Sequence, residues 1–185
     1  MKIGCGGFIV LGIIAVCVML ANGPPKPKPG PVAGNSGVQS DASTPRRVLP
    51  GLTGVDLHGN LTSKGFKLET LYGDSTTPGI SWHCTSTQNG CDLSAAGSGS
   101  TASELQSITA SVSHRSAGDP LPVAREFLGY IATLEYDGSK PAEAREWVRK
   151  HIPENDATTT IGPVRFTIKG TKWARILIME PAKPN

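Results

Sequence analysis

The chain is poor in aromatic residues and carries little net charge. Phe, Trp and Tyr together make up 5% of its 185 residues, and the formal net charge is +3. That charge is unevenly placed: residues 1–47 carry +4, whereas thirteen basic and fourteen acidic residues give −1 over 48–185. Because nucleic-acid-binding proteins carry a basic patch on their folded part, this distribution argues against nucleic acid as a partner.

Sequence signatures of catalysis are also missing. The chain has no Gly-x-Ser-x-Gly nucleophile motif, and the glycines within 97–100 lack the spacing and the following lysine of a phosphate loop. His58, His114 and His151 have no partner at metal-ligand spacing. We therefore expect no cofactor, no metal ion and no recognisable catalytic residue, and we favour a non-enzymatic function.

One long apolar run, Ile3–Ala21, is present and contains no charged or strongly polar side chain. As a helix rising about 1.5 Å per residue it would measure roughly 28 Å, close to the hydrocarbon thickness of about 30 Å of a bilayer. We therefore predict that residues 1–21 form a transmembrane signal anchor, with residues 3–21 in the membrane.

Two other interpretations of this segment remain open. Ala21-Asn22-Gly23 offers small residues for cleavage of a signal peptide, and Cys17 is a candidate for lipid modification in a bacterial lipoprotein signal. The retained anchor is favoured because cleavage would leave two prolines near the new amino terminus. In addition, Val16 precedes Cys17 at a position where a lipoprotein signal has a small residue.

Residues 22–47 contain almost nothing able to enter a hydrophobic core. Their Pro-Lys-Pro-Lys-Pro start predicts extended polyproline II, and the Gly-, Ser- and Asn-rich remainder predicts flexible coil. We interpret this segment as a disordered linker that separates the membrane from a folded domain at 48–185.

Two observations disagree about the side of the membrane on which that domain lies. Lys26 and Lys28 follow the apolar segment while only Lys2 precedes it, which leans slightly toward a cytoplasmic domain. Cys84 and Cys91 flank a turn and read as a disulfide, which is typical of oxidising compartments. We give the cysteines more weight and predict an extracytoplasmic domain.

Residue periodicity within 48–185 predicts a helix, three strands, a helical turn, a strand, two helices and two strands. Thr53 and Ser139 are the expected N-caps of the first and last helices, and Asp119-Pro120 begins the middle one. We read this order as an α+β fold, with one antiparallel sheet and helices packed mainly on one face. The strands are expected at 66–72, 80–85, 91–96, 107–113, 164–169 and 172–179.

The hairpin at the cysteines is expected to pair Cys84 directly with Cys91. A tight Asn89-Gly90 turn would not permit this pairing, so we expect a longer loop. The register would place His83 opposite Asp92 on the outer face, with serines 81 and 94 nearby. We do not interpret this group as a catalytic triad, because residues two apart on a flat strand do not provide the required geometry or an oxyanion hole.

Three successive strands place apolar residues on one side and small polar residues on the other, which is typical of a sheet with one solvent-exposed face. In the closing hairpin, a two-residue turn at 170–171 would pair Ile168 with Trp173. The last strand is apolar on both faces, so it is either covered on both sides or exposes an aliphatic stripe. The candidate binding residues on the outer face are Ser81, His83, Asp92, Ser94, Thr109, Ser111, Ala174, Ile176 and Ile178.

These observations favour a membrane-tethered extracytoplasmic interaction domain that presents an open sheet face to a protein or envelope component. Two alternatives remain: a structural component of an envelope or surface particle, and an enzyme whose catalytic residues are scattered and carry no motif.

Overall fold

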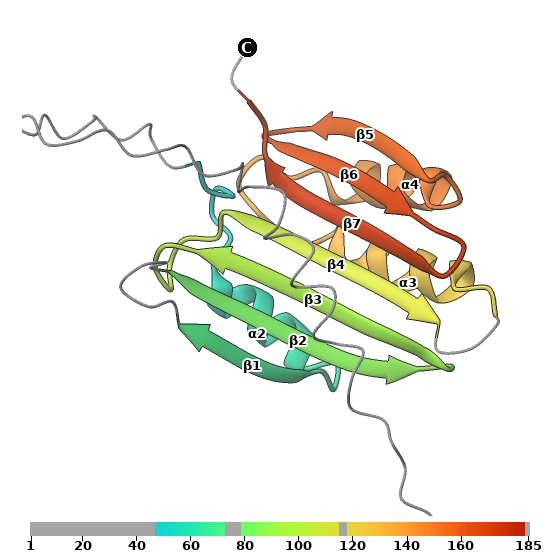
Figure 1. The fold of residues 1–185 in the computed structure, drawn as a ribbon. Coiled ribbons are helices and arrows are strands. Elements are labelled where there is room, and N and C mark those ends of the chain that lie inside the picture. Colours follow the sequence, from blue (N-terminus) through green and yellow to red (C-terminus); the bar gives the residue numbers. More distant parts are fainter. Residues whose placement is uncertain (1–46, 73–78, 115–117, 184–185) are drawn as a thin grey trace, which may run out of the picture. The chain divides into compact units, whose positions relative to one another are not determined.

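The structure is a computed structural model that describes residues 47–72, 79–114 and 118–183. These residues form one antiparallel sheet of seven strands, in the order β1-β2-β3-β4-β7-β6-β5 (Figure 1). The α+β architecture predicted from the sequence is therefore confirmed. The strands are β1 (Lys67–Tyr72), β2 (Ile80–Gln88), β3 (Cys91–Gly99), β4 (Ser107–His114), β5 (Asp156–Ile161), β6 (Val164–Gly170) and β7 (Ala174–Pro181).

The first helix, α2 (Gly54–Thr62), begins where the sequence predicts. Thr53 accepts a hydrogen bond from the Asp56 backbone N–H, and the Asp56 carboxylate accepts one from the Thr53 backbone N–H. This capping box satisfies backbone donors that a helix start otherwise leaves unpaired. Leu57 and Leu61 are fully buried, so the helix packs its apolar side against the sheet.

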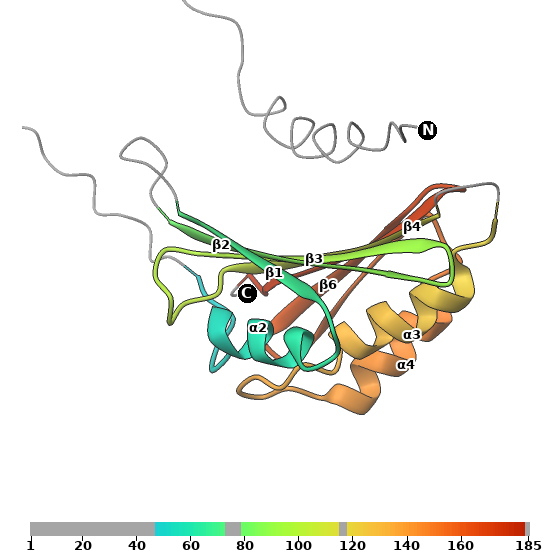
Figure 2. The same ribbon diagram turned by 90° about the horizontal axis from the view of Figure 1, so that it is seen from below.

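Two further helices, α3 (Leu121–Ile131) and α4 (Pro141–His151), follow β4. Both begin with proline in the first turn, and α4 is capped by Lys140 without a side-chain hydrogen bond, not by Ser139 as expected. The three described helices lie on the same side of the sheet (Figure 2). The hydrophobic core fills the space between them and the sheet, and Phe66 stacks on Phe127 within it at 5.3 Å between ring centroids.

The predicted register of the β2–β3 hairpin is wrong. Asn89 and Gly90 have φ of 50° and 75°, the conformation of a two-residue type I′ turn, and Gln88 pairs with Cys91. This pairing places Cys84 opposite Ala95, about 13 Å along the strand from Gln88.

The predicted Cys84–Cys91 disulfide is wrong for the same reason. The two cysteines are free and buried in this hairpin. Their separation exceeds the Cα–Cα distance of about 7 Å that a disulfide can bridge.

The closing hairpin also departs from its expected register. Ile168 pairs with Leu177, and the turn spans four residues from Thr171 to Ala174. Trp173 is consequently 48% exposed instead of facing the core. Arg175 is the buried residue here, and its Nε donates to the Ile152 carbonyl at the end of α4 at 2.8 Å.

Strand β5 was not predicted from the sequence. It pairs with β6 through a turn in which Gly162 has φ of 59° and is followed by a proline, the pattern of a type II′ turn. Strand β5 forms one edge of the sheet and β1 forms the other.

The predicted anchor at 1–21 and all but the last residue of the linker at 22–47 lie outside the described residues. None of the helices that are described is long and apolar enough to cross a bilayer.

Candidate binding face

The side of the sheet opposite the described helices, which we call the open face, carries all nine predicted binding residues. Alternate residues of a strand point to opposite sides of a sheet, and the neighbours Trp82, Leu93, Ala110 and Leu177 are buried toward the helices. Among the nine, Thr109 is exposed and the others are half-buried. The prediction that they share one face therefore agrees with the register, while several of their predicted pairings do not.

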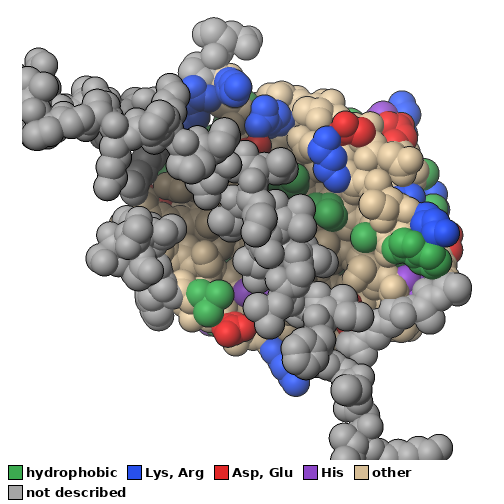
Figure 3. All heavy atoms as spheres, viewed as in Figure 1, with side chains coloured by type: hydrophobic (Ala, Val, Ile, Leu, Met, Phe, Trp, Pro, Cys, Tyr) green, Lys and Arg blue, Asp and Glu red, His purple; other side chains and the backbone are tan. Residues whose placement is uncertain are grey.

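Two isoleucines of the open face lie near its centre, on β7 between β4 and β6, and the exposed Leu71 lies at its edge, on β1. Ile178 lies between Thr109 and Thr167, and Ile176 lies between Ser111 and Lys169. None of the described helices lies over β7 on this side, so among the described residues the pattern agrees with the alternative of an exposed aliphatic stripe rather than a strand covered on both sides. Small polar side chains and backbone dominate the visible part of this face, with a few hydrophobic groups near its middle (Figure 3).

Serine side chains on β3 and β4 hydrogen-bond to each other across the strands. Ser94 Oγ lies 2.8 Å from Ser111 Oγ, and Ser98 Oγ lies 2.9 Å from Ser107 Oγ. These lateral bonds keep the side chains low and pair part of their hydrogen-bonding capacity within the protein. The result is a level surface that another molecule can approach closely.

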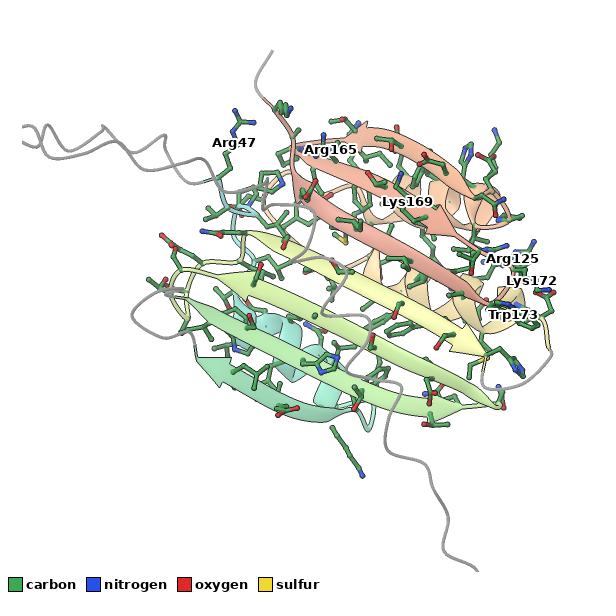
Figure 4. The ribbon with its side chains drawn as sticks, viewed as in Figure 1. Arg47, Arg125, Arg165, Lys169, Lys172 and Trp173 are labelled. Atoms are coloured by element: carbon green, nitrogen blue, oxygen red, sulfur yellow. The ribbon has the colours of Figure 1, made fainter. Side chains whose placement is uncertain are left out.

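Four charged residues of the open face lie toward β5 and form two ion pairs, whereas Lys67 and Glu69 lie at the opposite edge, on β1. Arg165 Nη2 lies 2.5 Å from the Glu180 carboxylate, and Lys169 Nζ lies 2.9 Å from the Asp156 carboxylate. Figure 4 shows Arg165 and Lys169 on β6, beyond the isoleucine-bearing strand β7. Because these cations already have carboxylate partners, this side of the face is not a strong site for anionic ligands.

A separate small cluster lies at the β6–β7 turn. Lys172 Nζ is 4.4 Å from the centroid of the Trp173 ring, and Arg125 of α3 lies at the same end of the molecule (Figure 4). An exposed cation over an aromatic ring contributes about 0.5–1 kcal/mol. Trp173 is exposed and directly precedes β7. The predicted register of this hairpin placed it toward the core, so its exposure was not expected.

The Ser, His and Asp residues of the open face do not form a catalytic group. His83 pairs in register with Ala96, whereas Asp92 pairs with Thr87 and accepts its hydroxyl hydrogen bond at 3.2 Å. His83 and Asp92 are therefore separated along the strands instead of opposite each other as predicted.

Among the described residues four side chains have clearly raised pKa values, and burial is the leading cause in each. Burial raises the pKa of the Cys84 and Cys91 thiols, and the neighbouring Asp92 carboxylate adds to the increase at Cys91. Burial also raises the pKa of Tyr130, and burial together with Glu143 raises the pKa of Tyr136 to about 12. A group prepared for nucleophilic or general-base chemistry near neutral pH needs a pKa near 7, so none of these four fits that role.

Two open surface depressions, of about 370 and 410 Å³, lie on the helix side. The first lies between Thr133 and α4, and the second is lined by Tyr130, Asn60 and Asp56. Within the described ranges no group of three His, Cys, Asp or Glu side chains is arranged to hold a metal ion.

Comparison of the chain with family models, with curated proteins and with solved structures found no match. The functional argument therefore rests on the residues and geometry of the chain itself.

Proposed function

We propose that this protein is a membrane-tethered interaction domain that binds a protein partner through the open face of its sheet. The observation that carries the proposal is the aliphatic stripe of Ile176 and Ile178 on β7, flanked by Thr109 and Ser111 on the side opposite the described helices. An aliphatic centre with a polar surround is the usual anatomy of a protein-binding surface.

The energetics favour a partner that is held at the same membrane. Burying the two isoleucine side chains contributes roughly 3–6 kcal/mol at most, whereas association costs about 4–15 kcal/mol of lost freedom. The open face alone therefore binds weakly. Confinement of both molecules to one membrane by anchors such as residues 1–21 raises their effective concentration, and a weak contact then suffices.

We also propose that the domain is extracytoplasmic, on the evidence of the apolar segment alone. This placement no longer draws on a disulfide, because Cys84 and Cys91 are free. The support that remains is the apolar segment: a cleaved signal peptide and a lipoprotein signal would both export the domain, and a retained anchor allows export. Labelling of a cysteine introduced at the exposed Arg125, in intact cells and after permeabilisation, decides the side.

Photo-crosslinking tests the binding face. A photo-reactive amino acid is placed at Thr109 on the open face of the full chain in membranes, and at Glu126 on the exposed side of α3 as the matched control. We expect one discrete protein adduct from position 109 and none from position 126. Equal adducts from both positions, or none from position 109, would contradict an interaction through the open face.

A further inference from the structure

The free edge of β5 presents a defined set of unpaired backbone groups. Gly170 N–H donates to the Asn155 carbonyl at 2.8 Å, which identifies that pair as a hydrogen-bonded one. In an antiparallel ladder such pairs alternate with pairs that are not hydrogen-bonded. Residues 157, 159 and 161 therefore turn their backbone groups toward β6, and Asp156, Thr158 and Thr160 turn theirs outward.

Nothing in the described part of the chain pairs with this outward side, because β5 is the last strand of the sheet. The side chains of Asp156, Thr158 and Thr160 are all exposed. Edge strands of stable monomers usually carry lysine, proline or a bulge that discourages pairing. Strand β5 has none of these, and its one charged residue, Asp156, lies at its first position and is paired with Lys169, whereas the opposite edge, β1, carries Lys67 and Glu69 on its exposed side.

We propose that β5 pairs with β5 of a second copy of this chain, antiparallel and symmetric about Thr158. This arrangement joins the two seven-stranded sheets into one. The outward groups of Asp156, Thr158 and Thr160 then form on the order of six backbone hydrogen bonds. A two-fold axis of this kind runs perpendicular to the sheet, so the two open faces lie on the same side of the joined sheet.

The side chains of β5 suit self-pairing better than pairing with an arbitrary strand. Thr158 meets its own copy, and threonine pairs are favourable across antiparallel strands. Asp156 of each copy lies opposite Thr160 of the other, so a carboxylate meets a hydroxyl donor and no like charges oppose each other. The Asp156 carboxylate is also paired with Lys169 at 2.9 Å within its own chain.

The layer beneath the edge is also compatible with an added strand. Helix α4 packs under β5, where Trp147 stacks on His151 at 5.1 Å and is only half-buried. On the helix side of the joined strands, Ala157 of each copy lies opposite Thr159 of the other. These small side chains and the half-buried Trp147 ring would form the helix-side contact of the added strand.

Disulfide trapping in the full chain tests this contact. Cys5 and Cys17 are replaced by serine, and Thr158→Cys is compared in membranes with Thr167→Cys, its register neighbour on β6. Across the proposed axis, two copies of position 158 are about 5.5 Å apart, and two copies of position 167 are about 14 Å apart. We expect a covalent dimer at least ten times more abundant from position 158, and equal trapping at both positions or none at 158 would overturn the proposal.

A second variant separates this contact from association through the anchor. Thr158→Pro removes an N–H that makes no bond within the sheet, while Thr158→Val keeps it. We expect dimers, measured by energy transfer between labelled full chains in vesicles, to be lost in the proline variant and kept in the valine variant, with unchanged thermal midpoints. Dimers that persist in Thr158→Pro, or a β5 edge occupied by another protein, would refute self-pairing. The open-face crosslink does not depend on this result, so the two proposals fail separately.

Discussion

Gln88 pairs with Cys91 across the Asn89-Gly90 turn, and this pairing leaves Cys84 opposite Ala95. Both thiols are almost completely buried, at 0% and 1% exposure, and burial raises the pKa of each. Because the thiolate is the reactive form, such thiols are inert in the folded state.

We predict that neither thiol reacts in the folded protein. With Cys5 and Cys17 replaced by serine, a thiol reagent should label no cysteine of the native chain and both cysteines after denaturation. Reductant should leave the thermal midpoint unchanged. A native mass lower by two hydrogens, or a thermal midpoint lowered by reductant, would show that Cys84 and Cys91 form a disulfide after all.

Two glycines of α2 should respond to alanine in opposite directions. A Cβ at Gly59 would meet no atom within 4 Å, whereas a Cβ at Gly54 would lie 2.2 Å from the Trp82 ring. Gly59→Ala should therefore stabilise the protein by about 0.5–1 kcal/mol, the usual difference between glycine and alanine inside a helix. Gly54→Ala should destabilise it by about 1–3 kcal/mol through overpacking. Denaturant titration measures both, and equal effects would show that α2 does not pack on Trp82 as described.

Tyr136 should be replaceable by phenylalanine without loss of stability at pH 7. Its hydroxyl is buried and has no hydrogen-bond partner among the described residues. Removing an unpaired buried polar group is neutral or favourable by about 1 kcal/mol. A loss of more than about 1 kcal/mol on denaturant titration would indicate a hydrogen bond to this hydroxyl.

The same substitution should change the alkaline stability profile. The pKa of Tyr136 is raised from 10.0 to about 12 in the folded state, so the unfolded chain loses this proton first as the pH rises. Below pH 10 the side chain is neutral in both the folded and the unfolded state, so it adds no pH dependence. Between about pH 10 and 12 only the unfolded chain is deprotonated, and the free energy of unfolding falls. The free energy of unfolding of wild type relative to Tyr136→Phe should therefore fall over that range, and a constant difference would argue against the raised pKa.

Aspartate substitutions on the two faces of β7 should differ in their effect on folding. Ile176 is half-buried on the open face, whereas Leu177 is 0% exposed in the core. Ile176→Asp should leave the thermal midpoint nearly unchanged, and Leu177→Asp should prevent folding because it buries an unpaired charge. If Ile176→Asp also unfolds the domain, β7 is covered on both sides and the open face does not exist in this form.

Sheet faces proved easier to predict than sheet registers. Both hairpin registers were wrong, yet each was displaced by an even number of residues: Ile168 pairs with Leu177 and not Trp173, and Cys84 pairs with Ala95 and not Cys91. Since side chains alternate with a period of two, an even displacement leaves every residue on its predicted face. The apolar alternation therefore identified the open face without fixing which residues are neighbours across it.

The missed features have physical causes. The assumption of a disulfide overrode Asn89-Gly90, which is the strongest short hairpin signal. Strand β5 was missed because, of its core-facing residues, only Ile161 is large and apolar, while Ala157 and Thr159 are small and half-buried and give no apolar alternation. The helices were found because their buried residues follow the helical period. Trp173 is exposed, contrary to expectation, because the two-residue turn between β6 and β7 lies at Lys172-Trp173 and not at Gly170-Thr171.

The most direct test of the central claim is the yield of the crosslinked adduct from a photo-reactive residue at Thr109, compared between two variants of the full chain. Ile176→Asp places a charge at the aliphatic centre of the open face, and Val55→Asp makes the same kind of change on α2, where Val55 is 60% exposed. We predict that the adduct disappears in Ile176→Asp and persists in Val55→Asp, with both variants folded. An adduct that survives Ile176→Asp at its original yield would contradict the account, because the partner would then bind without the open face of β7.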